Sequence, residues 1–314
     1  LLAPGAAAAQ AATDPSLVYD RIDAMVRMRD GVRLQTEVYV PRGVKEKLPI
    51  LLIRTPYGFK PDAKGYTAFL SGPWLQPLLR DGYLLAVQSI RGRFRSEGYY
   101  AYGNDAPRDR KDPRSTDEAT DAWDTVEWLL ARVPSNGRVG MLGVSTPGRL
   151  TAMAMLEPHP AVRAYSPQAT PADNFIGDDD FHLGAFRAGG MIEFVHAMES
   201  GKEFADFTRD RLDDFEWYLE LGPLSRVDER FFHGKKATWN DFTAHPTYDE
   251  YWQRRALPRL LSRPPAPVLH VGGWFDQEDL RGPQALFQAM EAGDAKGWNH
   301  LVMGPWAHRT WRED

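Results

Sequence analysis

The sequence contains no cysteine, which excludes disulfide bonds, cysteine nucleophiles and cysteine-ligated zinc. It has no apolar run near the roughly 20 residues that a transmembrane helix needs. Neither sign of charge dominates, because 38 basic residues face 43 acidic ones and the formal net charge is -5. This balance gives no electrostatic reason to expect a nucleic acid or an anionic membrane surface as a partner.

The composition is that of an ordinary globular protein, with 43% hydrophobic and 26% charged residues among 314. Such a length can bury one substantial core with room for a subdomain. The chain opens on Leu-Leu-Ala-Pro-Gly and an alanine-rich stretch. Residues 1–20 are therefore interpreted either as the remnant of a secretory signal, which predicts a periplasmic or secreted protein, or as a disordered tail or cloning remnant.

The order of the predicted elements indicates an open α/β sheet. Residues 22–40 have the alternation and the central turn of a β-hairpin. A capping box of Ser115 and Glu118 predicts the start of a helix, and further helices are expected over 149–156 and 280–292. Short, mainly apolar runs at residues 49–54 and 83–90 predict strands buried on both faces, as in parallel sheets. Residues 139–142 are a further apolar strand, and further short strands are expected at 162–166, 267–272 and 300–303.

Residues 174–258 interrupt this pattern. They are rich in aromatic and charged side chains and lack short apolar strands, which predicts a helical cap inserted into the sheet domain. The α/β core is accordingly assigned to residues 21–173 and 259–314.

A candidate nucleophile lies between a predicted strand and a predicted helix, in Gly143-Val-Ser145-Thr-Pro-Gly148. A serine at this position needs a sharp turn, and small residues around it make the turn possible. Gly143 stands two residues before Ser145 and Gly148 stands three residues after it. The pattern is a variant of the nucleophile elbow of serine hydrolases.

The two partners of such a serine should follow later strands, the acid before the histidine. Asp276 follows the strand predicted at 267–272, and His308 follows the last one. His308 could instead be a surface histidine, although its place after a buried strand argues against this. His270 lies within its strand and is predicted to be a packed core residue.

Two donors are needed for the oxyanion that forms during acyl transfer. The first is expected from the backbone N–H of Thr146, directly after the nucleophile, where Pro147 does not interfere because it is not the donor. The second is expected near Tyr57, whose hydroxyl can donate. From the residues alone, a turn aromatic with no role in catalysis is the favoured interpretation of Tyr57.

Several motifs together resemble the X-Pro dipeptidyl peptidase and cocaine-esterase group of α/β-hydrolases, and within it the α-amino acid ester hydrolases. The resemblance runs from about residue 20 to residue 312. Its motifs are Pro56-Tyr57, Ser89-Ile-Arg-Gly-Arg93 with Ser96-Glu97-Gly98, Gly143-Val-Ser145, the stretch from Asn174 to Arg187, Trp274-Phe-Asp-Gln-Glu-Asp279, and Met303-Gly-Pro-Trp-Ala-His308.

The resemblance implies an α/β-hydrolase fold in which Ser145, Asp276 and His308 are the catalytic triad. It implies an oxyanion hole made by the Tyr57 hydroxyl and the amide of Thr146.

It also implies that a carboxylate cluster of Asp179, Glu278 and Asp279 binds the free α-ammonium group of the substrate. A cation removed from water needs such charges nearby. A calcium site is the competing interpretation. An acidic, solvated loop is a third interpretation, and it suits Asp178 and Asp180 better than it suits the carboxylates close to Asp276.

Two departures from the family pattern bear on activity. The family usually has Tyr directly after the nucleophile, where this chain has Thr146 followed by Pro147. The family also continues into a C-terminal jelly-roll domain, which is not part of this sequence because it ends at Asp314. A fragment, a truncated protein and a natural short variant all remain open.

The sequence thus predicts a serine hydrolase and acyltransferase that cleaves esters of α-amino acids through an acyl-enzyme on Ser145, with β-lactam amides as further candidate substrates. No cofactor and no metal are expected, and homo-oligomerisation stays open. A general esterase or X-Pro peptidase without selectivity for the amino group is the first alternative. A hydrolase-fold binding protein without activity is the second.

Overall fold

The structure of the protein is a computed structural model that describes residues 18–59, 67–102, 106–109, 111–112, 114–209 and 213–312. Most of the predicted N-terminal tail, up to residue 17, lies outside the described residues. No helix in these described ranges is long and apolar enough to cross a membrane.

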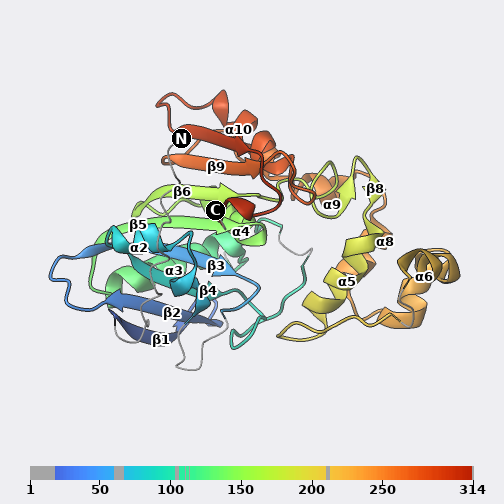
Figure 1. The fold of residues 1–314 in the computed structure, drawn as a ribbon, viewed down its shortest axis with the longest axis horizontal. Helices are drawn as coiled ribbons and strands as arrows, with labels where there is room; N and C mark the ends of the chain where they lie inside the picture. Colours follow the sequence, from blue (N-terminus) through green and yellow to red (C-terminus); the bar gives the residue numbers. More distant parts are fainter. Residues whose placement is uncertain are drawn as a thin grey trace, which may run out of the picture.

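An eight-stranded sheet with the order β1-β2-β4-β3-β5-β6-β9-β10 forms the centre of the molecule (Figure 1). All neighbouring strands are parallel except that β2 runs opposite to both β1 and β4. The strands are β1 (Tyr19–Arg27), β2 (Arg33–Pro41), β3 (Leu48–Thr55), β4 (Leu84–Ser89), β5 (Ser135–Val144), β6 (Val162–Gln168), β9 (Val268–Gly273) and β10 (Asn299–Gly304). The predicted hairpin and the predicted strands are therefore confirmed, with boundaries shifted by a few residues. The predicted burial on both faces is confirmed for β3 and β4.

Both faces of the central strands are covered, which explains why β3 and β4 are apolar up to their last two residues. On one face, Ile50 and Leu52 pack with apolar side chains of α3, α4 and α10. On the other face, Leu51 and Ile53 pack with Leu79 of α2. The covering helices are η1 (Ala68–Ser71), α2 (Gln76–Arg80), α3 (Glu118–Arg132), α4 (Thr146–Met153) with η2 (Ala154–Leu156), and α10 (Gly282–Glu291).

The segment between β6 and β9 is mostly helical and lies to one side of the sheet (Figure 1). Its helices enclose a hydrophobic cluster of their own, made largely of Phe, Tyr and Trp side chains such as Trp217, Trp239 and Trp252. Its elements are β7 (Phe181–His182), β8 (Ala185–Phe186), α5 (Ala188–Glu199), α6 (Asp214–Leu221), α7 (Ser225–Val227), η3 (Asp228–Phe232), α8 (Ala237–Ala244), α9 (Glu250–Gln253) and η4 (Leu257–Arg259).

Local details differ from the sequence prediction at the start of α3. The predicted capping box of Ser115 and Glu118 is wrong. The box is instead formed by Asp117 and Thr120, which exchange side-chain and backbone hydrogen bonds of 2.8 and 2.9 Å. An aspartate caps a helix as well as a serine does, so the motif shifted by two residues without changing the helix.

Candidate active site

Ser145 stands in the sharp turn between β5 and α4, with backbone angles φ 67° and ψ −133°. A non-glycine residue in such a conformation costs of order 1–3 kcal/mol. The turn also needs its glycines. A Cβ on Gly143 would lie 2.3 Å from the Pro147 carbonyl carbon, and one on Gly148 would lie 2.5 Å from the Gln168 carbonyl oxygen. Ser145 therefore has a strained backbone conformation at the position predicted for the nucleophile elbow.

Asp276 and His308 meet in the loops that leave neighbouring strands. Gly273 at the end of β9 is paired in register with Gly304 at the end of β10, so the loops that follow begin side by side. His308 Nδ1 lies 3.0 Å from each carboxylate oxygen of Asp276. Because these oxygens accept hydrogen bonds, Nδ1 carries the hydrogen and Nε2 is left as the basic nitrogen.

The pKa values of this pair favour a charged aspartate. Burial alone would raise the pKa of Asp276, but hydrogen bonds from His308, Asp279 N–H and Glu278 N–H outweigh it and hold that pKa below its usual range. Burial alone would lower the pKa of His308, but the hydrogen bond and charge of Asp276, with the charges of Glu278 and Asp179, raise it. The imidazole is therefore a stronger base than a solvated histidine.

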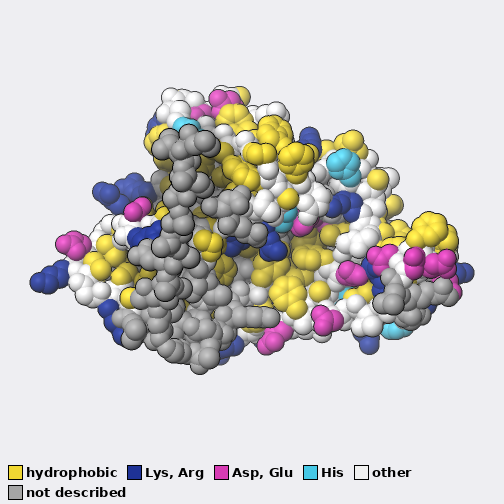
Figure 2. Space-filling model, viewed as in Figure 1, with side chains coloured by type: hydrophobic (Ala, Val, Ile, Leu, Met, Phe, Trp, Pro, Cys, Tyr) yellow, Lys and Arg dark blue, Asp and Glu magenta, His cyan; other side chains and the backbone are white. Residues whose placement is uncertain are grey.

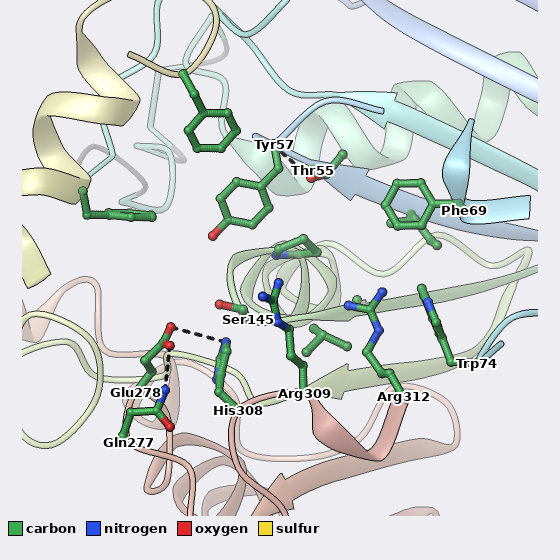
Figure 3. A pocket seen from close by; sticks show the side chains of 16 residues that line it. Thr55, Tyr57, Phe69, Trp74, Ser145, Gln277, Glu278, His308, Arg309 and Arg312 are labelled. Atoms are coloured by element: carbon green, nitrogen blue, oxygen red, sulfur yellow. Dashed lines mark hydrogen bonds and ion pairs between the residues drawn. The ribbon is translucent and has the colours of Figure 1, made fainter. Parts of the chain in front are cut away.

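Ser145 and His308 line the same cavity (Figure 3) without being hydrogen bonded to each other. His308 Nε2 lies 3.4 Å from a carboxylate oxygen of Glu278 instead. Hydrogen bonds between catalytic groups are often long in ligand-free enzymes and shorten when substrate binds. To form the hydrogen bond with His308 Nε2, the Ser145 side chain must rotate toward that nitrogen.

The Tyr57 hydroxyl lies 2.8 Å from the Thr146 hydroxyl, beside the nucleophile. Burial, partly offset by the neighbouring hydroxyls of Thr146 and Ser145, raises the pKa of Tyr57. The phenol therefore stays protonated and able to donate. Thr146, the residue that departs from the family pattern, contributes its side chain to holding this hydroxyl and still presents its backbone N–H at the first turn of α4.

Arg93 holds the loop that carries Tyr57. It is fully buried, and its guanidinium donates to the Pro56 carbonyl at 2.9 Å and to the Met198 carbonyl at 2.6 Å. Its guanidinium carbon lies 5.4 Å from the ring centre of Phe204, a ring that also stacks on Tyr57 at 5.9 Å. Arg93 therefore connects the Tyr57 loop to the end of α5.

The three carboxylates implied by the resemblance come together next to His308. Burial and the charge of Glu278 raise the pKa of Asp179 to about 6, while His308, Tyr102 and Arg187 act in the opposite direction. Tyr102 donates to Asp179 at 3.1 Å. Asp279 is fully buried, and neither of its oxygens has a hydrogen-bond partner. Burial, then the charges of Asp179 and Asp178, raise its pKa well above the usual value.

The neighbouring acids Asp178 and Asp180 are not in a solvated loop, so that interpretation is wrong. Their exposed fractions are 0% and 1%. Asp178 accepts hydrogen bonds from the N–H groups of Ala172, Asp173 and Gly282 at 2.8–2.9 Å. It ties the start of the insertion to the start of α10, a structural use that periodicity and composition do not indicate.

Arg187, a residue of the insertion, stabilises the backbone around the carboxylate cluster. Its guanidinium donates to the carbonyls of Gln277 at 2.6 Å and of Asp179 at 3.2 Å. Sequence reasoning did not assign roles to Arg187, Tyr102 or Arg93. All three lie within or near the motifs that resemble the hydrolase family. This position was the only indication of a role in the sequence.

A cavity of about 570 Å³ brings these groups together. Ser145, Tyr57, Glu278 and His308 line it, whereas Asp179 and Asp279 are buried and are not among its lining residues. Figure 2 shows hydrophobic side chains gathered between the sheet and the insertion, and Phe194 and Phe204 belong to the cavity lining.

No group of His, Asp and Glu side chains in the described ranges has an arrangement that would hold a metal ion. The calcium interpretation of the carboxylate cluster therefore finds no support among these residues. The packed role predicted for His270 is confirmed. Its exposed fraction is 0%, and burial lowers its pKa to about 4.

Comparison with known proteins agrees with this geometry. The sequence profile described as X-Pro dipeptidyl-peptidase (S15 family) matches residues 30–310. Cocaine esterase from Rhodococcus sp. (strain MB1 Bresler) is 30% identical over 300 residues, which cover 91% of this chain and 48% of the esterase.

Two solved structures are similar over nearly the whole chain. An aminopeptidase from a marine sediment Thaumarchaeota archaeon has a TM-score of 0.88 at 33% identity, with 96% of this chain and 50% of that chain covered. An α-amino acid ester hydrolase has a TM-score of 0.87 at 33% identity, with 100% and 53% covered. These likenesses confirm the α/β-hydrolase fold. The chain spans about half the length of these relatives.

Proposed function

The chain belongs to the X-Pro dipeptidyl-peptidase (S15) family of serine hydrolases, and on that premise we propose that it cleaves esters of α-amino acids through an acyl-enzyme on Ser145. The observation that carries the proposal is the carboxylate cluster beside His308. A triad alone supports only ester or amide cleavage, whereas a carboxylate cluster with one buried member, Asp279, that has no hydrogen-bond partner favours a substrate that brings a positive charge.

The chemistry assigned to the triad follows from its geometry. Ser145 Oγ attacks the carbonyl carbon while His308 Nε2 takes the hydroxyl proton, and Asp276 keeps the imidazole in the required tautomer. The carbonyl oxygen becomes negative and accepts hydrogen bonds from the Tyr57 hydroxyl and the Thr146 N–H. His308 then passes the proton to the leaving group, and water or an amine accepts the acyl group. β-Lactam amides and acyl transfer to an amine belong to the same proposal.

The free α-ammonium group is assigned to Glu278, which lines the cavity, and to the buried Asp179 and Asp279, which interact electrostatically with it. Asp279 has two buried oxygens and no hydrogen-bond partner, so an ammonium ion that donates to the cluster would stabilise its charged form. Arg187 donates to the backbone carbonyls of Asp179 and Gln277 and not to the carboxylates, so the carboxylate oxygens are not taken up by that guanidinium. This selectivity is what separates the proposal from a general esterase or an X-Pro peptidase.

We expect Asp279→Asn to reduce the preference for an amino ester by roughly 100-fold, because the variant removes a buried carboxylate whose charged form the ammonium group of the substrate would stabilise. The measurement compares kcat/KM for phenylglycine methyl ester and for its des-amino analogue, phenylacetic acid methyl ester. The ratio of the two constants, and not either rate alone, reports recognition of the amino group.

Asp206→Asn is the matched control, since Asp206 is an exposed aspartate of the insertion. It should keep the ratio of the unaltered protein. Equal kcat/KM for the two esters in the unaltered protein would remove the ammonium site and favour the general esterase.

A further inference from the structure

His308 lies between two carboxylates that belong to the same loop after β9. Its Nδ1 is 3.0 Å from the carboxylate oxygens of Asp276, and its Nε2 is 3.4 Å from Oε2 of Glu278, within the distance of an ion pair. Figure 3 shows this second contact as a dashed line between His308 and Glu278, with Ser145 in the same cavity. Both ring nitrogens are therefore faced by an acidic side chain.

The loop places Glu278 beside His308 through its backbone. The Glu278 N–H donates at 2.8 Å to Oδ1 of Asp276, an oxygen that also faces Nδ1 of His308. The Glu278 side chain is partly open to solvent, with an exposed fraction of 39%, and its Oε1 accepts a hydrogen bond from the Gln277 side chain at 3.1 Å. A ligand in the cavity can therefore reach the Glu278 carboxylate while the backbone of the loop stays in place.

The contact between Nε2 and Glu278 is favourable when Nε2 carries a proton. A neutral imidazole with its hydrogen on Nδ1 would turn the lone pair of Nε2 toward a carboxylate, which has only lone pairs to offer. An imidazolium donates from both nitrogens and is attracted by both carboxylates. The ligand-free arrangement thus favours the protonated form of His308, which cannot act as the base for Ser145.

The charges around the ring agree with this geometry. Burial disfavours the imidazolium, yet the pKa of His308 is raised. The acids that outweigh burial come from the loop after β9 and from the insertion, and they are Asp276, Glu278 and Asp179. Among the described residues, the remaining ionisable side chains that line the cavity are those of Tyr57, Arg309 and Arg312. The two arginines favour the neutral imidazole, so the raised pKa means that the acids dominate.

We propose that Glu278 holds His308 in its protonated, inactive form until the ammonium group of the substrate binds Glu278 and releases Nε2. This inference rests on the proposed function, because it needs an ammonium group at the carboxylate cluster. The ammonium donates to Glu278, the Nε2 proton passes to water, and Nε2 can then take the hydroxyl proton of Ser145. The amino group thereby activates the base, so selectivity for it should appear in kcat as well as in KM.

The test follows the acid limb of the pH profile, which reports the group that must lose a proton before catalysis. Phenylacetic acid methyl ester is the substrate because it has no ionisable group, and methylammonium supplies the missing positive charge. In Glu278→Gln we expect the acid limb of kcat/KM to move to lower pH by roughly 0.5–1 unit.

In the unaltered protein, saturating methylammonium should move the acid limb in the same direction. It should raise kcat/KM at pH values below the limb by about threefold or more, the factor that corresponds to half a pKa unit. Glu278→Gln should lose most of this response. Sodium chloride at the same ionic strength controls for screening of the charges.

Glu46→Gln is the matched control, because Glu46 is exposed just before β3, at the opposite end of that strand from Tyr57. It should keep both the acid limb and the response. An acid limb that stays in place in Glu278→Gln, or that methylammonium does not move, would overturn the inference. The proposed function would still stand if the amino ester were preferred. Equal kcat/KM for the amino and des-amino esters would instead contradict the proposed function, and with it the release of His308 by substrate.

Discussion

Replacing Ser145 by alanine is expected to lower kcat for a phenylglycine ester by roughly 10⁴-fold or more, because the acyl group then has no nucleophile to receive it. The substitution removes one oxygen at a position where only the backbone is strained. The fold should therefore remain, and KM should change far less than kcat. Steady-state kinetics on the purified variant gives both constants.

Ser135→Ala is the control for this variant, since Ser135 begins the same strand that Ser145 follows. Its circular dichroism and its rate should match those of the unaltered protein. A Ser145→Ala protein that keeps more than about one hundredth of the rate would mean that hydrolysis does not pass through this serine, because residual catalysis without a nucleophile is far smaller.

Replacing Asp276 by asparagine should lower kcat by about 10⁴-fold, the loss seen when a triad histidine is held in the wrong tautomer. An asparagine amide can donate to Nδ1, which moves the imidazole hydrogen to Nε2 and takes away the base. The side chain keeps nearly the same volume, and the N–H groups of Glu278 and Asp279 still find an acceptor oxygen.

The pH profile gives a second, independent signature of Asp276→Asn. The hydrogen bond with Asp276, followed by the charge of Asp276, is the main contribution that raises the pKa of His308 against burial. Without it the imidazolium is less stable, so the pKa falls and the acid limb of kcat/KM moves to lower pH. An acid limb that stays in place, or a kcat within tenfold of the original, would show that another group orients His308.

The positions of the three proposed triad residues were predictable from the sequence because their signals are local. Ser145 stands between an apolar strand and a helix, and Asp276 and His308 each follow a short apolar run. In a parallel sheet, residues that follow the carboxyl ends of the strands lie on the same side of the sheet. The register of Gly273 with Gly304 turns that expectation into a contact of 3.0 Å between Asp276 and His308.

Contacts between distant segments could not be predicted in this way. The sequence shows three aspartates in a row at 178–180, and nothing local indicates that Asp178 would bind backbone N–H groups while Asp179 faces Tyr102. The same holds for Arg93, whose acceptors Pro56 and Met198 lie on two other segments. From the sequence alone, a run of polar residues is expected to be exposed to solvent, and only the fold shows that it is buried.

The structure also gives the Thr146 side chain a role that the sequence does not indicate. From the sequence it was a smaller residue where the family has tyrosine, and it put activity in doubt. In the structure the Thr146 hydroxyl lies 2.8 Å from that of Tyr57, so the substitution retains a polar contact beside the nucleophile.

The most direct test of the central claim is covalent labelling of the folded protein with a fluorophosphonate, followed by mass spectrometry of the intact chain and its peptides. A serine activated by His308 attacks phosphorus and expels fluoride, so one adduct is expected, located on Ser145 and absent from Ser145→Ala. A folded protein that gains no adduct, or gains it on another residue, would contradict the account and favour a hydrolase fold that only binds.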